Sequence, residues 1–294
     1  MVGELHARVT RRGFRSRLCS MPVALATALA VAALFVVASG CSAGPTVTRD
    51  NSFTVGESPM VIVHGENGRI EVTSGANSTV AVHATLRGTE RIKYSVEQDG
   101  DTITVNAQVD QGWWPVSAGA DFVITVPIRT ELALETSNGP IELRGTAGSA
   151  SLATSNGRIF VEDLMGDVNA TTSNSAIDVA GMQGNGVFRT SNASVDLQQV
   201  SGEVDAQTSN GRISFIGNMT AGGSNRLITS NGAVDVELLG VPSVSLAAQT
   251  SNAKVTCRWP ITATETGDNR LVGVIGDGQA ALYIRTSNAG VTIR

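Results

Sequence analysis

The tripeptide Thr-Ser-Asn recurs eight times at nearly constant spacing, and this repeat constrains the fold more than any other feature of the sequence. Its asparagines are Asn138, Asn156, Asn174, Asn192, Asn210, Asn231, Asn252 and Asn288. They lie 18, 18, 18, 18, 21, 21 and 36 residues apart, and the last interval fits two periods with one copy lost near Asn269 or Arg270. A short fixed period is typical of a solenoid, in which each repeat (a rung) buries its apolar face against its neighbours.

The apolar positions within each repeat predict two short strands and two bends per rung. Before each asparagine, alternate residues are apolar, as at Val168 and Ala170, and the threonine and asparagine continue that face while the serine points outward. The parity shifts after the asparagine, where the third and fifth residues are apolar, as at Ile159 and Val161. Glycine often follows the asparagine, at Gly139, Gly157, Gly211 and Gly232, which suits a bend that needs unusual dihedral angles. A second bend is marked by Gly148, Gly166, Gly184 and Gly202.

The predicted fold class is therefore all-β: a parallel β-solenoid with rungs of about 18 residues over 131–294. Rungs stacked in chain order would leave the last edge, at Arg294, exposed or paired with another chain. Residues 55–130 alternate less regularly and are predicted to form a β-rich cap, although Asn67, Ile70 and Val72 fit the repeat phase. In this scheme residues 1–40 are a signal peptide and 41–54 a lipidated cysteine with a flexible tether.

The N-terminal segment predicts export. Five arginines precede an apolar run from Val23 to Ala38, which is roughly 24 Å long as a helix and short for a permanent membrane span. The small residues Ala38-Ser39-Gly40 and then Cys41 resemble a bacterial lipobox, which implies cleavage before Cys41 and acylation of its thiol. Export through the general secretory route and through a twin-arginine route, suggested by Arg11 and Arg12, both remain open. We expect an extracytoplasmic lipoprotein held at the cell membrane by its lipid.

Composition excludes several function classes. The 294 residues carry a net charge of −5 and are only 16% charged, so a basic nucleic-acid-binding surface is excluded. Without residues 1–40, the chain has 16 basic and 25 acidic residues, so anionic headgroups are not attracted to it. Three cysteines and three histidines give neither a disulfide scaffold nor a metal site, and we predict no catalytic residue, metal or cofactor.

The lipobox-like run and the repeated Thr-Ser-Asn-Gly and Thr-Ser-Asn-Ala segments resemble a bacterial family of putative-adhesin domains of unknown function. The resemblance covers about residues 55–294. It implies a repetitive extracytoplasmic β-structure, often carried on lipoproteins, and it brings no catalytic motif.

Several residues are candidates for a site. The asparagine ladder is interpreted as structural, with inward side chains bonded to the bend and to the rungs above and below. Trp113 and Trp114 are the best interaction candidates, or else plug the end of the solenoid.

The outward residue four positions after the asparagine is often acidic. Asp178 and Asp196, on adjacent rungs, could hold calcium or act as an acid/base pair, although a solvated face is the simpler interpretation. Cys257, His64 and His83 are interpreted as structural.

The leading hypothesis is a non-catalytic binding or adhesion surface for an unknown envelope protein or glycan. The alternatives are a structural or sensory spacer for an envelope signalling partner and, less favoured, a polysaccharide-acting β-helix enzyme. A cluster of acids beside an arginine or lysine in a cleft would favour the enzyme.

Overall fold

The computed structural model describes residues 46–75, 78–110 and 118–294, and these residues form two β-sheets facing each other. Cys41, Trp113 and Trp114 lie outside the described residues. In spatial order, sheet A contains β1 (Thr46–Thr54), β4 (Thr79–Arg87), β7 (Gly119–Pro127), β3 (Ile70–Gly75), β9 (Ile141–Arg144), β11 (Ile159–Met165), β13 (Ile177–Gln183), β15 (Val195–Ser201), β17 (Ile213–Asn218), β19 (Val234–Leu238), β25 (Val291–Ile293) and β21 (Val255–Cys257). In the same sense, sheet B contains β5 (Ile92–Asp99), β6 (Thr102–Val109), β2 (Met60–His64), β8 (Glu131–Thr136), β10 (Ala150–Thr154), β12 (Val168–Thr171), β14 (Gly186–Arg189), β16 (Val204–Gln207), β18 (Ser224–Ile228), β24 (Ala280–Arg285), β20 (Val244–Gln249), β23 (Arg270–Ile275) and β22 (Thr262–Thr266). A short 3₁₀ turn spans Thr89–Arg91.

The predicted all-β parallel solenoid is confirmed. Each regular rung gives one strand to each sheet, and equivalent residues stack in register, as Ile141, Ile159 and Ile177 do in sheet A. These side chains are fully buried between the sheets, with the residues two positions later in each strand. Because every rung contributes only a few apolar side chains, the core is a continuous row that neighbouring rungs complete for one another.

The eroded copy around Asn67 is a full rung of the same two sheets. Ile70 pairs with Ile141 and Val72 with Leu143, so β3 continues the parallel stack of β9. β2 pairs in parallel with β8 in sheet B. Both sheets thus run past residue 130 without a break.

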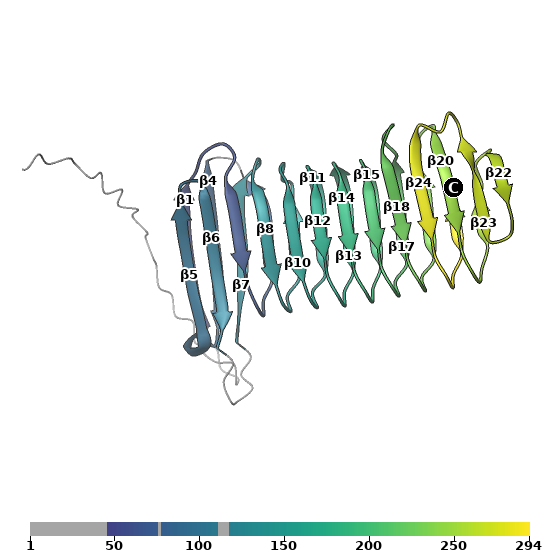
Figure 1. Cartoon of the computed structure of the whole chain (residues 1–294). Coiled ribbons are helices and arrows are strands. Elements are labelled where there is room, and N and C mark those ends of the chain that lie inside the picture. The colour runs from purple at the N-terminus through teal and green to yellow at the C-terminus, as the bar shows by residue number, and fades with distance from the viewer. Residues whose placement is uncertain (1–45, 76–77, 111–117) are drawn as a thin grey trace, which may run out of the picture. The chain divides into compact units, whose positions relative to one another are not determined.

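The order of the terminal rungs differs from the prediction. The rung of β24 and β25 lies between that of β18 and β19 and that of β20 and β21, so β24 stands between two earlier strands in Figure 1. Residues near Asn269 and Arg270, where a lost copy was predicted, instead form the antiparallel hairpin of β22 and β23. The strand that ends at Ile293 is flanked on both sides, by β19 and β21, and is no open edge.

The other end is interleaved in a similar way. The rung of β6 and β7 lies outside that of β2 and β3, although it follows it in sequence. Antiparallel strands then cover this outer rung: β4 and β1 in sheet A, and β5 in sheet B. At the far end β23 and β22 add antiparallel cover to sheet B, while sheet A ends at β21. The antiparallel strands shield the edges that they cover from edge-to-edge pairing.

The glycines that follow the asparagines pack closely against the preceding rung and do not have a positive φ, which corrects the prediction. None of Gly139, Gly157, Gly211 and Gly232 has a positive φ. A Cβ added to Gly157 would lie 1.7 Å from the carbonyl oxygen of Gly139 on the preceding rung. The backbone N–H groups of Gly157, Gly211 and Gly232 each donate to the hydroxyl of the threonine three residues earlier, at 3.1–3.2 Å.

Candidate functional site

The threonines of the repeat form a buried hydrogen-bonded row. Each hydroxyl donates to the backbone carbonyl of the residue that follows the asparagine on the preceding rung, at 2.8–3.3 Å. The eight threonines are no more than 7% exposed. The threonine side chains therefore point inward, as predicted. Each hydroxyl satisfies a backbone carbonyl at the bend that the sheets leave unpaired.

The eight asparagines form a second row, but they lie on the surface, so their predicted inward orientation is wrong. All are exposed, because each strand ends at the threonine or one residue before it, and the alternation of sides ends there. Each side-chain Nδ2 donates to the Oδ1 of the preceding rung at 2.5–2.9 Å, from Asn252 through Asn288 to Asn67. The backbone N–H groups of serine and asparagine both donate to the serine carbonyl of the preceding rung, as at Ser155 and Asn156. Hydrogen bonds between rungs, from the backbone and from side chains, therefore explain why the Thr-Ser-Asn tripeptide is repeated.

We expect Asn192→Ala to lower the free energy of unfolding by about 1 kcal/mol, because it removes two ladder hydrogen bonds. Ser191→Ala should change it by less than about 0.5 kcal/mol, since that side chain is exposed and the bonds of Ser191 are made by its backbone. Urea unfolding of both variants measures the difference. Equal losses would contradict a stabilising role for the amide row.

The histidines and the cysteine do not gather into a site. His64 faces Glu135 at 3.4 Å and His83 faces Asp50 at 2.5 Å, on different sheets. Cys257 is half-buried, burial raises the pKa of its thiol, and its Sγ lies 3.7 Å from the carbonyl oxygen of Trp259. Among the described residues, no group of three His, Cys, Asp or Glu side chains could hold a metal ion.

Asp178 and Asp196 do lie on adjacent strands, but each has its own partner. Asp178 pairs with Arg158, and Asp196 accepts a hydrogen bond from the hydroxyl of Ser194 at 2.8 Å. Neither arrangement is the cluster of oxygens that calcium requires.

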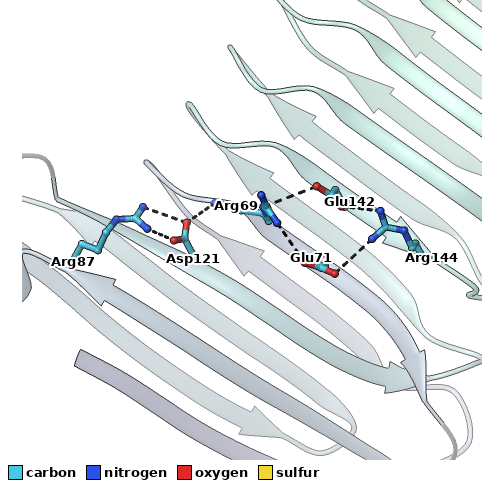
Figure 2. Close-up of polar contacts among 6 residues, drawn as sticks. All are labelled: Arg69, Glu71, Arg87, Asp121, Glu142 and Arg144. Carbon is cyan, nitrogen blue, oxygen red and sulfur yellow. Dashed lines mark hydrogen bonds and ion pairs between the residues drawn. The ribbon is translucent and has the colours of Figure 1, made fainter. Parts of the chain in front are cut away.

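The most developed polar cluster lies on the outer face of sheet A. We call the row of Arg69, Glu71, Arg87, Asp121, Glu142 and Arg144 the charged face; Figure 2 shows it crossing the strands. It joins β4, β7, β3 and β9, which are neighbours in the sheet. Three cations and three anions alternate along it.

The charged face is held by ion pairs of unequal closeness. Arg87 donates both ends of its guanidinium to Asp121, whose Oδ1 also accepts the backbone N–H of Arg69 at 2.9 Å. Arg144 contacts Glu142 at 2.9 Å and Glu71 at 3.5 Å. The side chain of Arg69 is looser, at 3.7 Å from Glu71 and 3.9 Å from Glu142.

A cavity of about 500 Å³ opens beside these pairs. Its lining is the turn from Asn67 to Arg69 with Glu71, Arg87, Asp121–Val123 and Asn138–Pro140. Val123 contributes an exposed apolar surface, at 44% of its full area. The cavity therefore combines planar polar groups with apolar patches, as ligand sites do.

A smaller hollow of about 200 Å³ adjoins the cavity, because Pro140 lines both of them. Glu142 of the charged face lines the smaller hollow. The ring of Phe160 lies between two guanidinium groups, 5.2 Å from that of Arg144 and 6.0 Å from that of Arg158. Burial alone would lower the pKa of Arg144, but hydrogen bonds and charge from Glu142 and Glu162 outweigh it and raise that pKa. The hydrogen bond that Arg158 donates to Asp178 raises the pKa of Arg158.

Sequence reasoning missed the charged face. Arg69 and Glu71 stand two and four residues after Asn67, at the same repeat positions as Pro140 and Glu142, so the repeat phase could have placed them. Arg87 and Asp121 carry no such signal, because only the antiparallel pairing of β4 with β7 brings them beside the stack.

The fold places the protein among parallel β-solenoids with capped ends. More closely, the chain belongs to the Toastrack DUF4097 family, whose model matches residues 60–294, and the resemblance inferred from the repeats is confirmed. No curated protein matches the sequence. In the part of the chain that the structure describes, no helix has the length and apolarity needed to cross a membrane.

Three solved structures are similar to this chain at 12% identity. One is a putative cell adhesion protein from Clostridium sporogenes ATCC 15579, with a TM-score of 0.26, covering 84% of this chain and 98% of that one. Another is a putative adhesin from Bacteroides fragilis NCTC 9343, with a TM-score of 0.31 and coverage of 85% and 97%. The third is a putative lipid binding protein from Parabacteroides distasonis ATCC 8503, with a TM-score of 0.37 and coverage of 85% and 97%. At such TM-scores these likenesses carry no argument about this chain.

Proposed function

We propose that this protein is an extracytoplasmic lipoprotein that binds a component of the cell envelope, without catalysis, through the charged face and its cavity. The observation that carries the proposal is the cavity of about 500 Å³ beside alternating arginines and carboxylates on an otherwise regular stack. Such a cavity can fix the orientation of a ligand by several directed hydrogen bonds.

The attachment of the chain supports a site at this end of the stack. Thr46, the first described residue, pairs with Arg87 of the charged face. The proposed lipidation residue Cys41 is five positions earlier, and five residues span at most roughly 18 Å. A lipid on Cys41 would therefore hold the charged face close to the membrane surface, where envelope material is dense.

Cleavage of a polysaccharide is the second candidate, because acids beside arginines in a cavity are what such an enzyme needs. The lining contains no histidine, serine, cysteine or lysine, so its only groups for proton transfer or nucleophilic attack are Glu71 and Asp121. Each of these is ion-paired with an arginine, so the lining holds no unpaired carboxylate for a pair of catalytic acids. Binding is therefore the better-supported activity.

The test of anchoring uses cells that make the full chain. Cys41→Ala should move the protein out of the membrane fraction, and an unchanged membrane fraction would overturn the lipid anchor.

The test of binding uses the full chain, purified in detergent and immobilised, and offered solubilised envelope protein and purified cell-wall glycan separately. Capture should be saturable and should be lost in Arg69→Ala/Glu71→Ala. The matched control is Arg212→Ala/Asp235→Ala, which removes an ion pair of 2.5 Å from the same sheet face, far along the stack. Capture of neither class, or equal capture by both variants, would contradict binding through the charged face.

A further inference from the structure

We infer that the ligand of the charged face is a neutral glycan chain, laid across the strands of sheet A with its sugar hydroxyls on Arg69 and Glu71. This inference rests on the proposed function and names the chemical class of its ligand. Four observations carry it: the charge balance, the loose contacts of Arg69, the apolar platforms and the spacing of the rungs.

The charge balance disfavours a charged ligand. The six side chains of the charged face contribute three positive and three negative groups, and every group has an opposite partner; Arg144 also contacts Glu162, beside this row, at 3.1 Å. An anionic ligand would have to displace carboxylates from their arginines, and a cationic one would meet guanidinium groups at each step. A sugar hydroxyl both donates and accepts hydrogen bonds, so it can bond to a carboxylate and a guanidinium at once.

Arg69 has bonding capacity to spare. Its side-chain contacts of 3.7 and 3.9 Å are longer than hydrogen bonds, whereas the Arg144–Glu142 contact of 2.9 Å is a full one. A hydroxyl placed between Arg69 and Glu71 would replace one long contact with two hydrogen bonds of ordinary length. This position lines the cavity, so a ligand can reach it.

The cavity also offers apolar surfaces among the polar groups. Val123 is exposed at one side, and Pro140 lines both the large cavity and the small hollow. The C–H face of a sugar ring packs on such surfaces while its hydroxyls bond at the rim.

The geometry of the stack suits a linear polymer. Parallel strands are about 4.8 Å apart, so a chain running across β7, β3 and β9 meets a new arginine–carboxylate pair at each strand. This spacing is comparable to the length of one sugar ring.

The charged face is not needed to hold the stack together. On the rung of β13, where the sheet is equally regular, Ala176 and Ala180 stand at the positions of Arg69 and Arg144, and the position of Glu71 holds Asp178, which has one arginine partner, Arg158. Exposed ion pairs contribute about 0–1 kcal/mol. Stability alone does not explain this cluster of charges, whereas binding of a ligand does.

The experiment titrates three neutral glycans, an N-acetylglucosamine tetrasaccharide, a mannan and a dextran, into the full chain in detergent and measures Kd by calorimetry. We expect at least one to bind, with Kd changing less than about twofold between low and high salt, because no counterions are released. Arg69→Ala/Glu71→Ala should weaken binding at least about tenfold. Arg212→Ala/Asp235→Ala should leave it within about twofold.

Two comparison ligands separate the alternatives: dextran sulfate, and vesicles containing phosphatidylglycerol. Tighter, salt-sensitive binding of either one that is lost in Arg69→Ala/Glu71→Ala would overturn the neutral glycan. If none of the three glycans binds while envelope protein is still captured through the charged face, the proposed function stands and this inference falls. If nothing is captured at all, the proposed function itself falls.

Discussion

Replacing Gly184 with alanine is expected to lower the free energy of unfolding by about 3 kcal/mol. Gly184 marks the second bend of its rung and has a φ of +148°, a region that residues with a Cβ rarely adopt. An added Cβ would also lie 2.2 Å from the carbonyl oxygen of Gly166 on the preceding rung. Gly202 is packed in the same way onto Gly184, so a shift of one bend is passed to the next rung.

The control for this prediction is Gly222→Ala. Gly222 also has a positive φ, of +79°, but nothing lies within 4 Å of the position of its Cβ. The Gly222→Ala variant should lose about 1 kcal/mol of unfolding free energy, because of its backbone conformation alone. Urea unfolding of both variants measures the added cost at Gly184 of the backbone overlap together with its φ of +148°. Equal losses would mean that the rungs separate at the second bend at little cost.

The repeat period and strand parity predicted the regular rungs, because both follow from the geometry of extended chains. The buried positions after each asparagine, such as Ile159 and Val161, are where parity placed them. The same rule failed at the asparagines, since it holds only while the backbone stays extended and the strand ends two or three residues earlier. The orientation of an asparagine just past a strand end depends on the geometry of the bend, which the local sequence does not predict.

The order of the terminal rungs could not be predicted from spacing. An interval of 36 residues between Asn252 and Asn288 fits one lost copy as well as it fits a hairpin and a return. The returning strand β25 makes the same parallel bonds whether it adds outside β21 or inserts between β19 and β21. Only the packing of the whole end selects the insertion, so no local pattern records it.

The charged face shows a further limit of the repeat. The period places Arg69 and Glu71 beside Glu142, but it says nothing of strands outside the repeat. The antiparallel strands β4 and β7 supply Arg87 and Asp121, and these complete the lining of the cavity. The candidate site thus lies where the regular stack meets the irregular cap.

Removing a single hydroxyl from the threonine row should cost nearly as much as the glycine substitution. We expect Thr172→Val to lower the free energy of unfolding by about 2 kcal/mol, because it leaves the buried carbonyl of Gly157 without its donor. The Thr172 hydroxyl donates to that oxygen at 3.1 Å, and Thr172 is 2% exposed, so water does not reach the site to replace it. Valine keeps the shape of the side chain, so no cavity confuses the result.

The neighbouring residue supplies the control, since Thr171, the last residue of β12, has an exposed side chain. Thr171→Val should change stability by less than about 0.5 kcal/mol, because its hydroxyl is solvated. Urea unfolding and amide hydrogen exchange measure both variants, and the Thr172 variant should exchange faster at the rungs on either side of it. If the two valine variants unfold alike, the buried hydroxyls are dispensable, and the tripeptide stabilises the stack through its backbone and its asparagines alone.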